Sequence, residues 1–147
     1  MPTKYRGSAQ ETEALDAYIK LMRSSTSVLN QVTPRLQKAG LTFSQFGVLE
    51  ALYHLGPLCQ KELGDKLLQS GGNITMVVNN LERQGLVIRL RDEVDKRYIV
   101  VHLTWRGTQR IQELFPEHLN DIVACFKVLS SKELSQLNQL LRKVGKG

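Results

Sequence analysis

The segment from Asn73 to Arg83 carries amide, hydroxyl and guanidinium groups along one side of an expected helix. Its apolar residues recur at the i, i+3, i+4 and i+7 spacing of a buried helical stripe. They are Ile74, Val77, Val78 and Leu81. The opposite face consists of Asn73, Thr75, Met76, Asn79, Asn80 and Arg83. Such groups hydrogen-bond base edges and phosphates: asparagine pairs with adenine, threonine contacts bases or a thymine methyl, and arginine binds guanine or a phosphate.

A merely solvated helix face is the alternative interpretation of these residues. Solvated faces are usually rich in glutamate and lysine, whereas this segment has Glu82 as its single carboxylate. It also carries the adjacent Asn79 and Asn80, and asparagine is a mediocre helix former. A face with few carboxylates can enter a major groove about 12 Å wide without repelling phosphates. The pattern therefore favours a helix that reads double-stranded DNA.

A short helix and a turn precede this segment. Leu63 and Leu67 give the expected helix at 60–68 one buried face, and the turn Gln69-Ser70-Gly71-Gly72 follows it. Ser70 is a typical N-cap for the next helix, and we count it among the predicted DNA-binding residues. The two helices and their turn predict a helix-turn-helix.

A hairpin with a charged tip is expected after the DNA-reading helix. Its strands, at 87–91 and 98–103, are rich in β-branched residues. Ile88 and Leu90 are expected to share one face with the alternating apolar residues of the second strand, which are Ile99, Val101 and Leu103. This hairpin predicts the wing of a winged helix-turn-helix.

The wing supplies the remaining predicted DNA-binding residues, which are Arg89, Arg91, Asp95, Lys96 and Arg97. Asp95 is expected to orient Arg97 through a charge-assisted hydrogen bond across the turn. A guanidinium held in this way loses less entropy on entering a narrow minor groove, where the negative potential is enhanced. The alternative is a solvated tip of mixed charge, and the wing residues taken by themselves leave both interpretations open.

The elements around the wing predict a mainly α fold with a β wing. Capping boxes of the form S/T-x-x-E/Q begin at Ser8, Thr42 and Ser130. Helices are expected at 11–38, 43–54, 60–68, 72–84, 104–128 and 131–143. Pro34 is expected to bend the first helix or end it early, and Pro116 to kink the fifth.

The first, fifth and sixth helices carry more apolar side chains than a small core can cover, which favours a homodimer. We therefore predict a DNA-binding domain at 41–107 and a dimerisation region at 1–40 and 108–147.

The bulk properties of the chain fit a nucleic-acid-binding protein. Its 147 residues carry a net charge of +6, which favours an acidic partner. No apolar run approaches the ~20 residues that span a bilayer, and no secretory signal is apparent, so we expect a cytoplasmic protein without a membrane partner. The three histidines have no metal-ligand spacing and no catalytic constellation is present, so we expect no enzyme activity, no metal and no cofactor.

The stretch from Leu63 to Gly107 resembles the MarR family of bacterial regulators. In this chain the D-x-R pattern of that family's wing is Asp95-Lys96-Arg97, and its L-T-x-x-G pattern ends at Gly107. The order of the flanking helices also matches, so the resemblance covers nearly the whole chain. One departure is Glu93, which stands where proline is common in the family's wing.

The resemblance implies a homodimer with interlocking terminal helices that binds pseudo-palindromic DNA. It implies that the helix face named above reads bases and that Arg97 enters the minor groove. It also implies control by a small phenolic ligand or an oxidant, and we expect a repressor that a small aromatic effector releases from DNA. The family's peroxide sensors place their reactive cysteine in the first helix, where this chain has none.

Two other function classes are weighed against this interpretation. A winged-helix module that binds only protein has no need of a cationic wing with Arg89, Arg91 and Arg97. An enzyme that uses Cys59 lacks a paired base. Cys59 stands where an N-cap residue is expected, and a thiol there favours oxidation chemistry; a weak substitute for a capping serine is the alternative.

Overall fold

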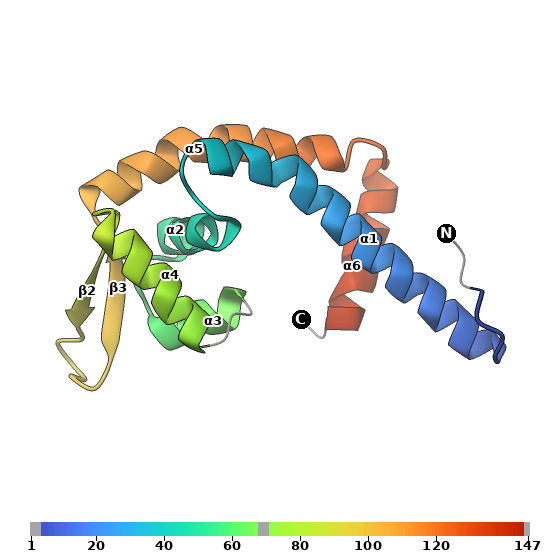
Figure 1. Cartoon of the computed structure of the whole chain (residues 1–147), viewed down its shortest axis with the longest axis horizontal. Helices are drawn as coiled ribbons and strands as arrows, with labels where there is room; N and C mark the ends of the chain where they lie inside the picture. Colours follow the sequence, from blue (N-terminus) through green and yellow to red (C-terminus); the bar gives the residue numbers. More distant parts are fainter. Residues whose placement is uncertain (1–3, 68–70, 146–147) are drawn as a thin grey trace. The chain divides into compact units, whose positions relative to one another are not determined.

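The computed structural model describes residues 4–67 and 71–145 (Figure 1). These residues form two compact units. The winged unit is Thr33–His118, and the helical unit consists of residues 4–32 and 119–145. Among the described residues, none of the helices combines the length and the apolar character that crossing a membrane requires.

The winged unit is built on helices α2 (Phe43–Leu55), α3 (Gln60–Leu67) and α4 (Gly71–Arg83). Its core contains side chains that are fully withdrawn from solvent, among them Val48, Leu49, Leu63, Val78, Leu81, Val101 and Ile111. The predicted stripe of α4 is confirmed, since Ile74, Val78 and Leu81 are buried and Val77 is partly buried. The stripe fixes which side of α4 faces outward.

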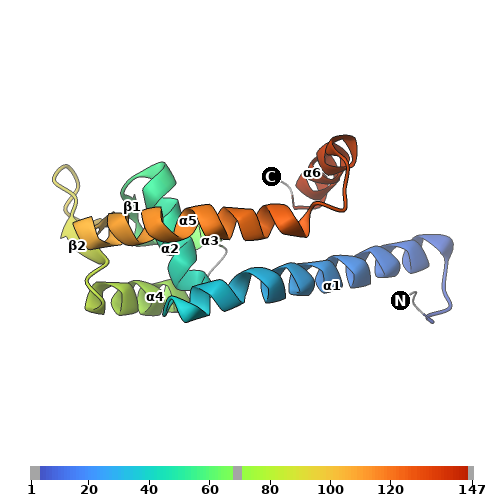
Figure 2. The same ribbon diagram turned by 90° about the horizontal axis from the view of Figure 1, so that it is seen from above.

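A three-stranded antiparallel sheet completes the winged unit, in the order β1-β3-β2. The strands are β1 (Leu58–Cys59), β2 (Val87–Arg91) and β3 (Ile99–Leu103). The loop that joins β2 and β3 projects beyond the helices of this unit (Figure 1, Figure 2). The fold is therefore the mainly helical winged helix-turn-helix expected from the sequence.

Strand β1 was not predicted, because two residues are too few to show an alternating pattern. Leu58 pairs with Val101 and Cys59 with Val100. Cys59 thus ends a strand where only a helix cap was expected. The backbone N–H of Cys59 still donates to Oε1 of Glu62 at 3.4 Å, so the glutamate half of a capping box is present.

The faces of β2 differ from the prediction. Arg89 pairs with the buried Val101, whereas Ile88 pairs with His102 and Leu90 with Val100. Because directly paired residues lie on the same side of a sheet, Arg89 occupies the inner face, and Ile88 and Leu90 are exposed. The prediction that Ile88 and Leu90 share a face with Val101 is wrong, since alternation alone does not show which set lies inward.

The L-T-x-x-G segment joins the wing to the end of α4. The Thr104 backbone N–H donates to the Leu86 carbonyl at 3.1 Å, and the Thr104 hydroxyl donates to the Gly85 carbonyl at 2.6 Å. The Gly107 N–H donates back to Thr104 Oγ1 at 3.0 Å. A Cβ on Gly107 would overlap the Leu86 carbonyl, so this close approach requires glycine. Gly85 itself has φ +75, the left-handed conformation expected of a helix C-cap.

Three long helices account for most of the remaining chain: α1 (Ala9–Lys38), α5 (Trp105–Cys125) and α6 (Ser131–Gly145). The predicted capping boxes at Ser8 and Ser130 are present, and the hydrogen bonds from these serines lower the pKa of Glu11 and of Glu133. Helix α1 continues through Pro34, so its early end is not observed. Helix α5 continues through Pro116 and ends a few residues earlier than predicted.

Candidate nucleic-acid interface

The outward face of α4 presents the predicted base-reading groups to solvent. Asn73, Thr75, Asn79 and Arg83 are exposed, Met76 is 62% exposed, and Asn80 is half-buried. Ser70, the predicted cap, lies outside the described residues. The face combines amide, hydroxyl, thioether and guanidinium groups on a rigid helix, which is suited to contact base edges.

An arginine bonded to an asparagine amide lies at the end of this face. Nη1 of Arg83 donates to Oδ1 of Asn80 at 3.2 Å. The two residues are three positions apart on α4 and are therefore neighbours on its surface. The pair places a cation at the last turn of the helix, where it also complements the helix dipole.

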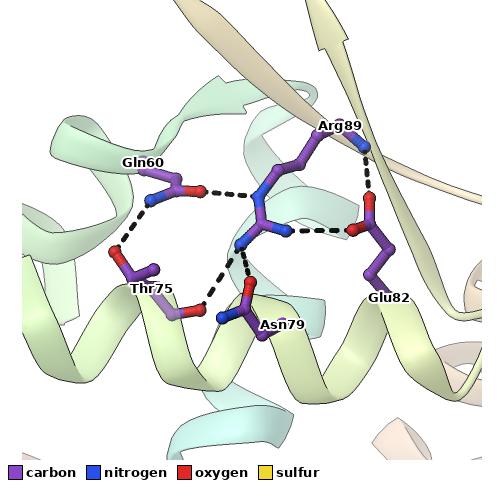
Figure 3. A network of polar contacts seen from close by, with 5 residues as sticks. All are labelled: Gln60, Thr75, Asn79, Glu82 and Arg89. Carbon is purple, nitrogen blue, oxygen red and sulfur yellow. Dashed lines mark hydrogen bonds and ion pairs between the residues drawn. The ribbon is translucent and has the colours of Figure 1, made fainter.

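Arg89 is the most extensively bonded cation of the interface (Figure 3). Its Nε donates to Oε1 of Gln60 at 2.7 Å, and its Nη1 donates to Oε1 of Glu82 at 3.0 Å. Its Nη2 donates to Oδ1 of Asn79 at 2.6 Å and to the Thr75 carbonyl at 3.4 Å. The side chain is 18% exposed. We call the residues Gln60, Thr75, Asn79, Glu82 and Arg89 the Arg89 cluster.

The Arg89 cluster changes how Arg89 is interpreted. The sequence suggested a direct contact with DNA, whereas the guanidinium is engaged by α3 and α4. A direct contact stays a prediction, and the geometry favours a positioning role. Sequence reasoning missed Gln60 and Glu82 because the inward direction of Arg89 depends on the strand register, which the β2 pattern did not reveal.

The wing tip holds Arg97 against Asp95 in a two-point contact. Arg97 donates from Nε to Oδ1 at 3.0 Å and from Nη2 to Oδ2 at 2.7 Å. This pairing lowers the pKa of Asp95 and raises that of Arg97. The predicted hydrogen bond between the two is therefore present, and the Arg97 side chain is 85% exposed. An oriented and accessible guanidinium is what insertion into a minor groove requires.

The other cations near the wing tip are Arg91, which ends β2, and Lys96, which lies in the loop. Nη1 of Arg91 donates to the Lys96 carbonyl at 2.9 Å, and both residues are exposed. The loop is closed by backbone bonds from Asp92 to Tyr98 and from Tyr98 to Asp95. The basic groups of the wing are thus carried on an ordered turn.

Metal ligands and cysteines are the other candidates for chemistry in the described residues. Within 4–67 and 71–145 no group of three or more histidine, cysteine or acidic residues could hold a metal ion. Cys59 and Cys125 are free and half-buried. The Cys125 thiol donates to the Asp121 carbonyl at 3.2 Å, which fits a structural residue.

The chain belongs to the MarR family of transcriptional regulators. A sequence model of the MarR family matches residues 39–97. The chain is 34% identical over 133 residues to the HTH-type transcriptional regulator MhqR of Bacillus subtilis (strain 168), covering 90% of this chain and 92% of that protein.

Solved structures of the family share the fold. Sco3205, a MarR family regulator of Streptomyces coelicolor crystallised with DNA, superposes with a TM-score of 0.85 at 22% identity, covering 98% of this chain and 91% of that chain. NadR, crystallised with 4-hydroxyphenylacetate, gives a TM-score of 0.77 at 25% identity, covering 99% of each chain.

Proposed function

We propose that this protein is a cytoplasmic homodimeric repressor that binds a pseudo-palindromic operator and is released by a small aromatic effector. The observation that carries the proposal is the outward face of α4. Its buried stripe fixes the direction of the polar groups, and Asp95 holds Arg97 at the tip of the wing. The α4 face reads bases in the major groove, and Arg97 enters the adjacent minor groove.

Dimerisation is supported by an apolar groove in the helical unit. The groove has a volume of about 550 Å³ and is lined by residues that include Leu21, Val28, Phe126, Leu137, Leu141 and Val144. Leu21, Leu141 and Val144 are exposed in the single chain. A second copy covers these side chains and places two α4 helices in successive major grooves, ~34 Å apart.

Effector binding is supported by a cavity of about 370 Å³ inside the winged unit. Phe43, Phe46 and Leu67 give it an apolar wall, and Lys66 and His54 add groups that can pair with a carboxylate. The size and this lining suit a small aromatic acid, the class to which the 4-hydroxyphenylacetate bound to NadR belongs.

Filling this cavity is expected to block the response to effector. Small aromatic acids should release bound duplex from the parent protein in a fluorescence-anisotropy titration. Ala51→Leu adds bulk to the cavity wall, so at least about tenfold more acid should be needed, as expected when a pocket loses its shape. DNA affinity without acid serves as the control and should not change. Equal sensitivity of the two proteins to acid would argue against this cavity.

The proposed function is tested by a gel-shift titration against duplexes from the region upstream of the gene. Nanomolar-scale binding is expected, and it should weaken about a thousandfold between about 50 and 200 mM salt if six phosphates are contacted. A scrambled duplex of the same length is the control for sequence preference. Absent or salt-independent binding to every duplex would refute the proposal and leave a protein-binding module as the better account.

Asp95→Ala distinguishes two effects of Asp95 on DNA binding: the orientation of Arg97 and the net charge of the wing. Removing a carboxylate near DNA should strengthen binding if charge alone matters. If Asp95 acts by holding Arg97, the same change should weaken binding, by about three- to tenfold, despite the added positive charge. Glu93→Ala, an exposed acid of the same loop, is the matched control for charge. Tighter binding by both variants would reject the orienting role.

A further inference from the structure

We propose that Arg89 sets the hydrogen-bonding polarity of the α4 face, so that Asn79 reads guanine rather than adenine. The inference rests on the proposed function and adds a rule of base preference to it. It starts from one contact: Nη2 of Arg89 donates to Oδ1 of Asn79 at 2.6 Å (Figure 3).

The identity of the Arg89 donor fixes the orientation of the Asn79 amide. A guanidinium has N–H donors and no acceptor, so only the carbonyl oxygen of the amide can face it. The Nδ2 group, the other arm of the same planar amide, therefore points away from the guanidinium. Asn79 is exposed, and none of the described residues accepts a hydrogen bond from its Nδ2. The α4 face thus offers a hydrogen-bond donor at this position.

A donor at this position discriminates between the two purines. The paired contact of asparagine with adenine needs Oδ1 to accept from N6 while Nδ2 donates to N7. Here Oδ1 already accepts from the charged Arg89, which leaves its second lone pair a weaker acceptor for N6 and makes Nδ2 a stronger donor. Guanine presents two acceptors in the major groove, N7 and O6, whereas the N6 amino group of adenine is itself a donor. Thymine presents one acceptor, O4, whereas guanine presents two that both hydrogens of Nδ2 can reach, so Asn79 held in this orientation favours guanine.

The other contacts of the Arg89 cluster keep Arg89 in place. Gln60 Oε1 accepts from Nε while its Nε2 donates to Thr75 Oγ1 at 3.2 Å. Glu82 accepts from Nη1 and, through Oε2, from the Arg89 backbone N–H at 3.1 Å. The guanidinium is held from α3 and α4 at once. Because turning the amide would break a hydrogen bond to a charged group, the donor orientation is favoured about 10- to 100-fold.

Asn80 shows why the proposal is confined to Asn79. Its Oδ1 accepts from Arg83 at 3.2 Å, and Arg83 is exposed and itself a predicted DNA contact. Arg83 can move to the DNA and leave that amide to turn. Arg89 has only 18% of its side chain exposed and has partners on two helices, so it stays with the protein.

The test is selection of bound sequences from a randomised duplex library by the whole protein. The parent, Asn79→Ala and Arg89→Lys are compared, because lysine keeps the charge but lacks the planar fork that donates from Nε, Nη1 and Nη2 in fixed directions. The matched control is Arg35→Lys, since Arg35 also pairs with a glutamate, Glu117, at 2.8 Å. The position at which Asn79→Ala loses preference identifies the base pair that Asn79 reads.

The parent is expected to select G·C at that position, with about a five- to tenfold preference over A·T. Arg89→Lys should flatten the preference or shift it towards A·T, and Arg35→Lys should leave it as in the parent. Selection of A·T by the parent, or an unchanged preference in a folded Arg89→Lys, would overturn the inference while leaving the proposed function intact. If Arg89→Lys does not fold, the parent and Asn79→Ala still decide between G·C and A·T. A parent that enriches no sequence would refute the proposed function itself.

Discussion

Replacing Gly107 with alanine is expected to destabilise the protein by about 3 kcal/mol or more. The added methyl group would overlap the carbonyl of Leu86, which is backbone and cannot rotate away. Relief requires α5 to move from the turn after α4, and this movement would break the bonds that Thr104 makes to Gly85 and Leu86. The free energy of unfolding, measured by chemical denaturation, is the test.

Gly47→Ala is the matched control for this substitution. Gly47 also lies within a helix of the winged unit, and its added methyl would meet only the end of the Leu67 side chain, at 3.2 Å. That neighbour can shift, and alanine favours a helix by up to about 1 kcal/mol over glycine. The control should therefore change stability by less than about 1 kcal/mol. Equal effects of the two substitutions would mean that the junction at Gly107 is not tightly packed.

Replacing Arg97 with alanine is expected to weaken DNA binding about 10- to 100-fold. A dimer carries two wings, and the loss of roughly 1 kcal/mol at each wing gives this range. Arg97 is 85% exposed and bonds to Asp95 within its own loop. The melting temperature and the oligomeric state should therefore stay as in the parent, and fluorescence anisotropy at fixed salt measures the affinity.

Arg142→Ala is the control for the Arg97 substitution, because it removes one exposed arginine from α6. It should lower affinity only slightly, through net charge. The assignment of the wing would be wrong if Arg97→Ala bound as tightly as the parent. The assignment would also be wrong if Arg97→Ala and Arg142→Ala weakened DNA binding by the same factor, since net charge alone would then explain the effect.

The features that could be predicted from the sequence are those set by local periodicity and capping. The stripe that begins at Ile74 fixes the inner side of α4, and the patterns at Ser8, Thr42 and Ser130 form capping boxes. The Asp95–Arg97 contact spans two residues, so its geometry also follows from a short segment. In each case the interacting groups are close in sequence.

The features that were missed depend on pairing between distant segments. Strand β1 exists because Leu58 meets Val101, and neither residue signals the other. Arg89 lies inward because its register on β3 brings it to Gln60, which is 29 residues away in the chain. An arginine in a strand is usually exposed. The hydrogen bonds of the Arg89 cluster explain why Arg89 is directed inward.

Both sets of features hold together the surface that we propose for DNA binding. Thr104 ties the start of α5 to the end of α4, and Glu82 ties α4 to β2 through the side chain and backbone of Arg89. Helix and wing are therefore held to each other by hydrogen bonds at two separate places. Such preorganisation lowers the entropy lost when both elements engage DNA together.

Hydroxyl-radical footprinting of the parent protein on its best selected duplex tests the central claim most directly. The account predicts two equivalent protected segments related by a dyad, with centres about 10–10.5 base pairs or a multiple of this apart. Each half-site should lose protection at its flank when Arg97→Ala replaces the parent, because the wing then leaves the minor groove. One protected segment without a dyad on a tightly bound duplex would contradict the account.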